Sequence, residues 1–148
     1  MFLGAAPKTI LSTFPKAKLA VLFDQYAEEI AQSGLGPTLD EFRASLLKIR
    51  RAGFYLSRDE LENGVSALAS PLFTDDSGEA VGSLAVIVPT QRLEFANLDR
   101  LVESIREAAA RTSQRARSSK VGEPGPQLRR TRYRESGGPL SHHAERHS

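Results

Sequence analysis

The first clear pattern along the chain is a repeat of apolar residues at the three- and four-residue spacing of an amphipathic helix. It runs from about residue 15 to residue 33, and acidic and amide side chains fill the opposite positions. The apolar positions are Leu19, Leu22, Phe23, Tyr26 and Ile30. Gly34, Gly36 and Pro37 then interrupt the pattern, so we expect the first helix to end there.

A second helical pattern starts at Thr38, three residues before Glu41, in the arrangement of a capping box in which each side chain satisfies a backbone N–H. The residues expected to face inward are Leu39, Phe42, Leu46, Leu47 and Ile49. Lysine and arginine fill its last turn, where cations suit the negative end of a helix. Gly53 follows, which predicts a left-handed cap.

The pattern then changes to that of strands. Residues 54–56 indicate a short strand, and residues 57–60 a polar turn. The runs 65–73 and 80–88 are rich in β-branched or small residues and are joined by a loop with turn chemistry, which predicts a hairpin. Both alternating sets of side chains are apolar or small, so we expect both faces of the sheet to be largely covered.

Helical spacing returns at about residues 93–110, and large aliphatic residues nearly vanish after residue 115. The order of elements predicts an α+β fold, an antiparallel sheet flanked by helices. Three short strands make a thin sheet with an unpaired edge, and the chain starts abruptly, so we expect a domain that is incomplete at its start.

Chain length and the distribution of charge predict a domain boundary. The 148 residues have room for one ordinary domain. Residues 1–113 carry 12 Lys/Arg against 15 Asp/Glu, whereas residues 114–148 carry 8 against 3. We therefore expect one domain at 1–113 and a disordered basic tail at 114–148.

Composition excludes several classes of protein. The chain has no cysteine, so disulfides, thiol catalysis and cysteine-based zinc sites are excluded. Its apolar stretches are too short to span a bilayer, and no signal peptide is recognisable. We expect a cytoplasmic protein with no membrane association and no cofactor.

No catalytic constellation is visible. Ser70 has no histidine base in the folded part, since His142, His143 and His147 all lie in the tail. Asp59, Glu60 and Glu62 could form an acid/base pair or bind a hard metal ion, but we interpret them as a solvated turn. The sequence therefore does not predict an enzyme.

Two features of the tail have a functional and a simple interpretation. The run 129–134 holds four arginines and a tyrosine, which could neutralise phosphates, although such runs are commonly solvated appendages. The three histidines could chelate a transition metal weakly, but we do not expect a functional metal site.

Small side chains on the hairpin leave two explanations open. Ala67, Ala69 and Ala85, beside Val65 and Ile87, leave volume above the sheet that could form a pocket for a small molecule. The same alanines could equally let helices pack closely.

Several motifs in the same order resemble the effector-binding domain of IclR-family transcriptional regulators. They are GAAPKTILS at 4–12, LLKIRRAGF at 46–54, SRDELENGVSALASPLF at 57–73, GEAVGSLAV at 78–86 and PTQR at 89–92. The resemblance covers about residues 3–112, and its middle block is the most specific part. It implies a GAF-like domain in which a curved antiparallel sheet and its loops bind a small organic or aromatic acid.

Carried over by position, the resemblance implies an effector site that draws on a helix start, a turn and two strands. Its residues are Ala5, Ala6, Ser57, Val65, Ala67, Ala85 and Ile87. The family often has hydroxyl side chains where Ala85 and Ile87 stand, which favours a more apolar effector, or none.

The resemblance also implies partners. Family members assemble as oligomers, so we expect a homo-oligomer or a hetero-oligomer with full-length relatives. The family's winged helix-turn-helix and the first strands of its effector domain are missing from the pattern, so DNA would be contacted only indirectly. A misplaced start codon, a gene remnant and a fragment that docks onto an intact relative each explain this.

The main functional hypothesis is therefore a small-molecule-sensing module that regulates transcription through its association state. The alternative is an interaction domain that oligomerises with full-length homologues without a ligand.

Overall fold

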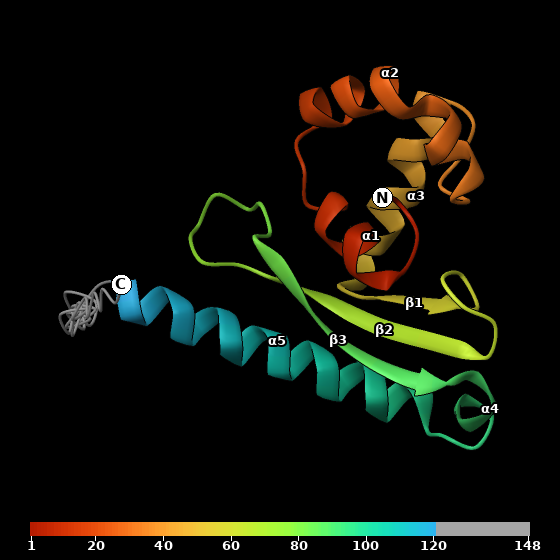
Figure 1. Cartoon of the computed structure of the whole chain (residues 1–148). Helices are drawn as coiled ribbons and strands as arrows, with labels where there is room; N and C mark the ends of the chain where they lie inside the picture. Colours follow the sequence, from red (N-terminus) through yellow and green to blue (C-terminus); the bar gives the residue numbers. More distant parts are fainter. Residues whose placement is uncertain (121–148) are drawn as a thin grey trace, which may run out of the picture.

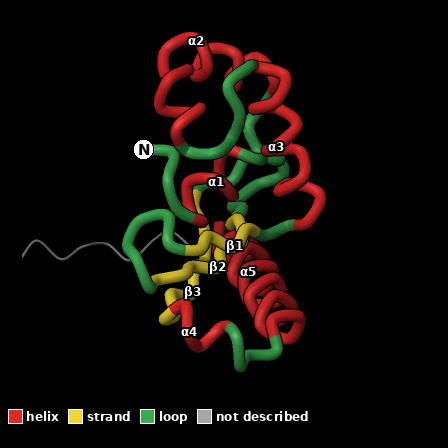
Figure 2. Tube along the Cα trace, turned by 90° about the vertical axis from the view of Figure 1, so that its right-hand side faces the viewer, coloured by secondary structure: helices red, strands yellow, loops and turns green. Residues whose placement is uncertain are grey.

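The computed structural model describes residues 1–120, and of Lys120 it describes only the backbone. The elements in chain order are α1 (Ala5–Leu11), α2 (Lys16–Gln32), α3 (Leu39–Ala52), β1 (Tyr55–Arg58), β2 (Val65–Leu72), β3 (Gly82–Pro89), α4 (Thr90–Leu93) and α5 (Leu98–Lys120). Helices α1, α2 and α3 lie on one side of the sheet and α5 lies along the other, which both views show (Figures 1 and 2). The predicted α+β architecture is confirmed.

The sheet is antiparallel throughout, in the order β1-β2-β3. Ser57 is the register partner of Ala67, which in turn pairs with Ile87. Two pairs further along, Tyr55, Ala69 and Ala85 form the next row on the same face. Within the described residues β1 and β3 are edge strands, so the predicted unpaired edge is present.

Helix α3 begins and ends where its sequence signals predict, but the Glu41 carboxylate accepts from the Thr38 hydroxyl instead of from the backbone N–H of Thr38. Thr38 Oγ1 accepts a hydrogen bond from the Glu41 N–H at 3.2 Å, and the Thr38 hydroxyl donates to the Glu41 carboxylate at 3.1 Å. At the other end Gly53 has φ 75° and its N–H donates to the Ile49 carbonyl, as the predicted left-handed cap requires.

The largest apolar cluster lies among the first three helices rather than on the sheet. Its buried side chains are Phe2, Leu11, Leu19, Ile30, Leu35, Phe42, Leu46 and Ile49. Leu47, predicted to face inward, is instead 45% exposed. It stands next to Leu46 at the border of the apolar stripe, where a helical period alone does not decide which side is covered.

The sheet is covered less evenly than predicted. Strand β2 is largely buried, with Leu68 and Ala69 fully so. On β3, by contrast, Ala85 and Val86 are exposed and Ile87 is 72% exposed. The expectation that both faces are largely covered is therefore wrong at this strand, because α1 and α5 pack mainly over β2.

The last helix is longer than predicted. Residues 114–120, expected to begin the disordered tail, form the last turns of α5. Alanine and arginine favour helix here, and Arg117 Nη2 donates to the Asp75 carbonyl of the hairpin loop at 3.0 Å. One turn earlier, buried Ser113 Oγ accepts from the Phe73 N–H at 3.0 Å. The rest of the predicted tail, 121–148, lies outside the described residues.

Candidate functional site

The five sheet residues of the predicted site share one face. Register partners on antiparallel strands project to the same side, and residues two apart on one strand do as well. Ser57, Ala67 and Ile87 form one row across all three strands, and Val65 and Ala85 lie two residues away along β2 and β3. We call this surface the sheet face.

The sheet face is the one on which α1 lies. Tyr55 belongs to the same face, because it pairs with Ala69, and its hydroxyl contacts Lys8 of α1. Ala5 and Ala6, the remaining predicted residues, form the first turn of α1. The Gly4 N–H just before them donates to Glu60 Oε2 at 2.9 Å, so this turn starts beside the loop that follows β1.

Exposure increases across the site from β1 to β3. Ser57 is 3% exposed and Ala5 is 1% exposed, whereas Ile87 is 72% exposed. The small side chain of Ala67 lies between them and is half-buried. The predicted residues thus form an open, shallow surface, which we call the shelf. Several hollows among the described residues are lined by other side chains.

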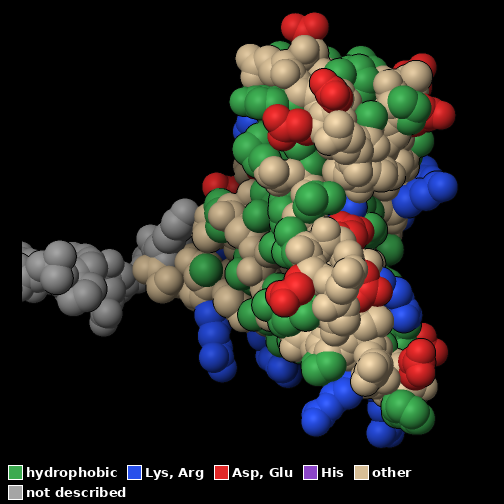
Figure 3. Space-filling model, turned by 45° about the vertical axis from the view of Figure 1, so that its right-hand side comes forward, with side chains coloured by type: hydrophobic (Ala, Val, Ile, Leu, Met, Phe, Trp, Pro, Cys, Tyr) green, Lys and Arg blue, Asp and Glu red, His purple; other side chains and the backbone are tan. Residues whose placement is uncertain are grey.

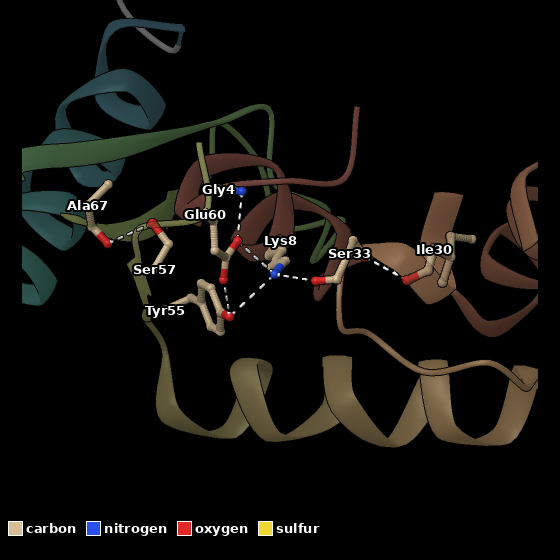
Figure 4. Close-up of polar contacts among 8 residues, drawn as sticks. All are labelled: Gly4, Lys8, Ile30, Ser33, Tyr55, Ser57, Glu60 and Ala67. Carbon is tan, nitrogen blue, oxygen red and sulfur yellow. Dashed lines mark hydrogen bonds and ion pairs between the residues drawn. The ribbon is translucent and has the colours of Figure 1, made fainter. Parts of the chain in front are cut away.

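A buried ionic cluster stands beside this shelf, and the sequence interpretation missed it (Figure 4). Lys8 is 2% exposed, and its Nζ donates to Glu60 Oε2 at 2.8 Å and to the Ser33 carbonyl at 2.9 Å. Tyr55 Oη donates to Glu60 Oε1 at 2.6 Å and accepts from Lys8 Nζ at 3.3 Å. These contacts join α1, the end of α2, β1 and the following loop.

The contacts within the cluster favour the ionised form of Glu60. Burial by itself would raise the pKa of Glu60, but hydrogen bonds from Lys8, Tyr55 and the Gly4 N–H outweigh it and lower that pKa. Burial raises the pKa of Tyr55 well above its usual value of 10, and its hydrogen bond to Glu60 adds to the effect. Glu60 is thus an ionised structural group around neutral pH.

The interpretation of Asp59, Glu60 and Glu62 as a solvated turn is therefore wrong for Glu60. Asp59 is exposed but organises the loop, since its Oδ1 accepts from the Gly64 N–H at 2.7 Å and from the Thr90 hydroxyl at 2.9 Å. Glu62 is exposed, as expected. The signal that could have found the cluster is Lys8 itself, because a lysine inside the small and apolar run GAAPKTIL needs a buried partner.

The remaining candidate chemistry has structural explanations. Ser70 Oγ donates a hydrogen bond to the Gly53 carbonyl at 2.7 Å. Among residues 1–120 no group of three metal-ligating side chains is found, and no helix there is long and apolar enough to cross a membrane. The tail histidines and the run 129–134 lie outside the described residues.

Basic side chains do gather on the described part of the last helix. Figure 3 shows them along the lower edge of the molecule, where α5 runs. After Glu107 the described helix has Arg111, Arg115 and Arg117 and no acidic residue. Arg117 is partly engaged with the hairpin loop through Asp75 and Asp76.

The described residues thus place small side chains on the sheet face, a helix start beside it and a buried ionic cluster at its edge. Residues 1–114 match the profile described as Bacterial transcriptional regulator IclR C-terminal. The chain belongs to this family, a family of transcriptional-regulator domains and not of enzymes.

Individual relatives agree with this assignment. The chain is 35% identical over 68 residues to HTH-type transcriptional regulator BhcR of Paracoccus denitrificans (strain Pd 1222), a match that covers 46% of this chain and 24% of that protein. An IclR-family regulator from Rhodococcus sp., known from its crystal structure, is 32% identical in sequence and matches with a TM-score of 0.58. This match covers 76% of this chain and 42% of that one.

A structure of the C-terminal domain alone, from a Vibrio cholerae transcriptional regulator, matches at 29% identity with a TM-score of 0.57. The match covers 72% of this chain and 60% of that domain. The chain thus spans about a quarter of its curated relative and less than two thirds of these solved chains.

Proposed function

We propose that this chain is the small-molecule-sensing module of an IclR-type transcriptional regulator, and that its effector, a small organic or aromatic acid, binds the sheet face. The observation that carries the proposal is the family match over residues 1–114 together with the row Ser57, Ala67 and Ile87 across the sheet. Such a module acts in the bacterial cytoplasm and affects DNA binding by the regulator that it controls.

The chemistry of the shelf suits a ligand with a flat apolar part. Ala67 and Ala85 have small side chains on this face, and the exposed Ile87 side chain offers an apolar wall. Ser57 supplies a hydroxyl at the buried end, although its Oγ is already directed at the Ala67 carbonyl at 3.4 Å. Pockets for small ligands combine mostly apolar walls with a few polar groups in this way.

Thermal unfolding of the full chain with a panel of carboxylic and aromatic acids tests the proposal. A ligand at ten times its Kd stabilises the native state by about 1.4 kcal/mol, which raises the Tm by roughly 5 °C. Ala67→Phe fills the shelf and should abolish the shift. Ala110→Phe, the same change at an exposed position of α5, should retain it. A shift that survives Ala67→Phe refutes binding at the sheet face.

The second candidate is an interaction domain that pairs with full-length homologues without a ligand. Strand β3 favours it, because this eight-residue edge strand exposes Ala85, Val86 and Ile87. Exposed edge strands are templates for pairing with another chain. We expect the chain to co-purify with a full-length family member even when no metabolite is added. Loss of this co-purification in Ile87→Lys would favour this function over effector sensing.

A further inference from the structure

A hollow away from the sheet face has the composition of an anion site. It measures about 320 Å³ and lies between the end of α1, the start of α2 and one side of α3. Phe14, Leu19 and Leu47 supply apolar walls, and Arg43 and Arg50 reach it from α3. None of the seven residues predicted for the effector site lines it.

Arg43 gives the hollow its chemistry. Its Nη2 donates to the Lys16 carbonyl at 2.9 Å, which fixes the guanidinium between α3 and the start of α2. Its Nε is buried and has no hydrogen-bond acceptor among the described residues. A buried N–H of a charged group that lacks an acceptor is costly and uncommon in native proteins, so a small shift of the Arg43 side chain that brings Nε to an acceptor in the hollow would be favourable.

The charged side chains that line the hollow favour an anionic ligand. Lys16, Arg43 and Arg50 line the hollow against a single acidic residue, Asp40. No ion pair joins Asp40 to Arg43 among the described residues, although the two are one turn apart on α3. An anion is therefore favoured, and a planar carboxylate matches the geometry of a guanidinium better than a spherical ion does.

The volume and the lining of the hollow narrow the class of ligand further. The volume is at the lower end of the roughly 300–1,000 Å³ of small-ligand pockets, which suits one ring or a short alkyl chain rather than a nucleotide cofactor. Phe14 offers an aromatic ring, and exposed Leu47 an apolar side chain, on which such a group can pack. We infer that the hollow between α1, α2 and α3 binds a small aromatic or aliphatic monocarboxylate through Arg43.

The inference also gives Leu47 a role. Its side chain is 45% exposed on α3, and it stands four residues after Arg43 and three before Arg50, so the three share one side of the helix. A carboxylate held by Arg43 would place its apolar part against Leu47 and cover it. The site would then join the start of α2 to α3 independently of the sheet face.

Calorimetric titration of the full chain with phenylacetate, and with phenylacetamide as the uncharged match, tests the site. We expect measurable binding of the acid and at least about tenfold weaker binding of the amide. Arg43→Gln should weaken acid binding about tenfold or more. Arg51→Gln, which removes the same charge from an exposed position of α3 outside the hollow, should change it less than threefold.

A measurement on the unmodified chain guards against a variant that fails to fold. The Nε–H resonance of Arg43, assigned through its loss in Arg43→Lys, should move on addition of phenylacetate and stay in place with phenylacetamide. No phenylacetate binding at millimolar concentration, an unmoved Arg43 resonance, or equal weakening by Arg51→Gln would overturn the inference. Binding abolished by Ala67→Phe and unaffected by Arg43→Gln would place the acid on the sheet face and overturn it as well.

Discussion

Removing the Glu60 carboxylate should destabilise the protein far more than removing an equally short ion pair at the surface. Lys8 and Glu60 are 2.8 Å apart with side-chain exposures of 2% and 18%. Lys18 and Glu79 are also 2.8 Å apart, but their exposures are 51% and 36%. The chain therefore holds a control pair at the same distance that is exposed and that lacks the added hydrogen bonds which Glu60 accepts from Tyr55 and the Gly4 N–H.

The magnitudes follow from what each change leaves behind. Glu60→Ala leaves the Lys8 ammonium buried with only the Ser33 carbonyl and the Tyr55 hydroxyl as partners. Leaving a buried charge uncompensated costs about 3–5 kcal/mol, a large part of the 5–15 kcal/mol that holds a typical domain together. Glu79→Ala should cost less than about 1 kcal/mol, because an exposed pair is solvated and screened.

Urea unfolding of the full chain, followed by circular dichroism, measures both. In double-mutant cycles with Lys8→Met and Lys18→Met, the buried pair should show a coupling free energy of at least about 1 kcal/mol and the exposed pair less than about 0.5 kcal/mol. Equal couplings, or a Glu60→Ala variant as stable as the wild type, would refute the structural role given to the cluster.

Three further changes follow from the same contacts. The folded-state pKa of Glu60 is lowered from its usual 4.5, so its contribution to stability is present above pH 4.5 and declines as the pH falls below that value. Glu60→Gln should therefore flatten the acid limb of a stability–pH curve measured by urea unfolding. The pKa of Tyr55 is raised, so its contribution to stability is present below pH 10 and declines as the pH rises above that value. Tyr55→Phe should remove this alkaline decline in the same measurement. Gly53→Ala, at φ 75° with Arg106 Nε only 3.3 Å from the new Cβ, should cost about 1 kcal/mol or more in the free energy of unfolding, and no change in the urea midpoint would contradict the strain argument.

The sequence predicted the elements well where local signals agree. Thr38 and Gly53 begin and end α3 as expected, because capping depends on neighbouring residues only. Helix α1 has no such pattern, since its buried residues include Lys8 and Thr9, and only the resemblance pointed to it. The length of α5 was missed because contacts from Ser113 and Arg117 to the hairpin loop are not visible in composition.

The candidate site was predictable only in part. Alternation along β2 and β3 places Val65, Ala67, Ala85 and Ile87 on one face, and the register adds Ser57. How far that face is covered depends on which elements pack over it, which is why the exposure of Ile87 was not foreseen. The Lys8–Glu60 pair joins residues 52 positions apart, a distance over which no local pattern reports.

The central claim is that the sheet face binds the effector. Amide chemical-shift mapping of the full chain with the acid that most raises its Tm tests this claim directly, because it locates the ligand without a variant. We predict that the largest shifts centre on Ser57, Ala67 and Ile87, with smaller ones at Ala5 and Ala6. Shifts confined to the hollow around Arg43, or a panel in which no acid perturbs the strands, would contradict the claim.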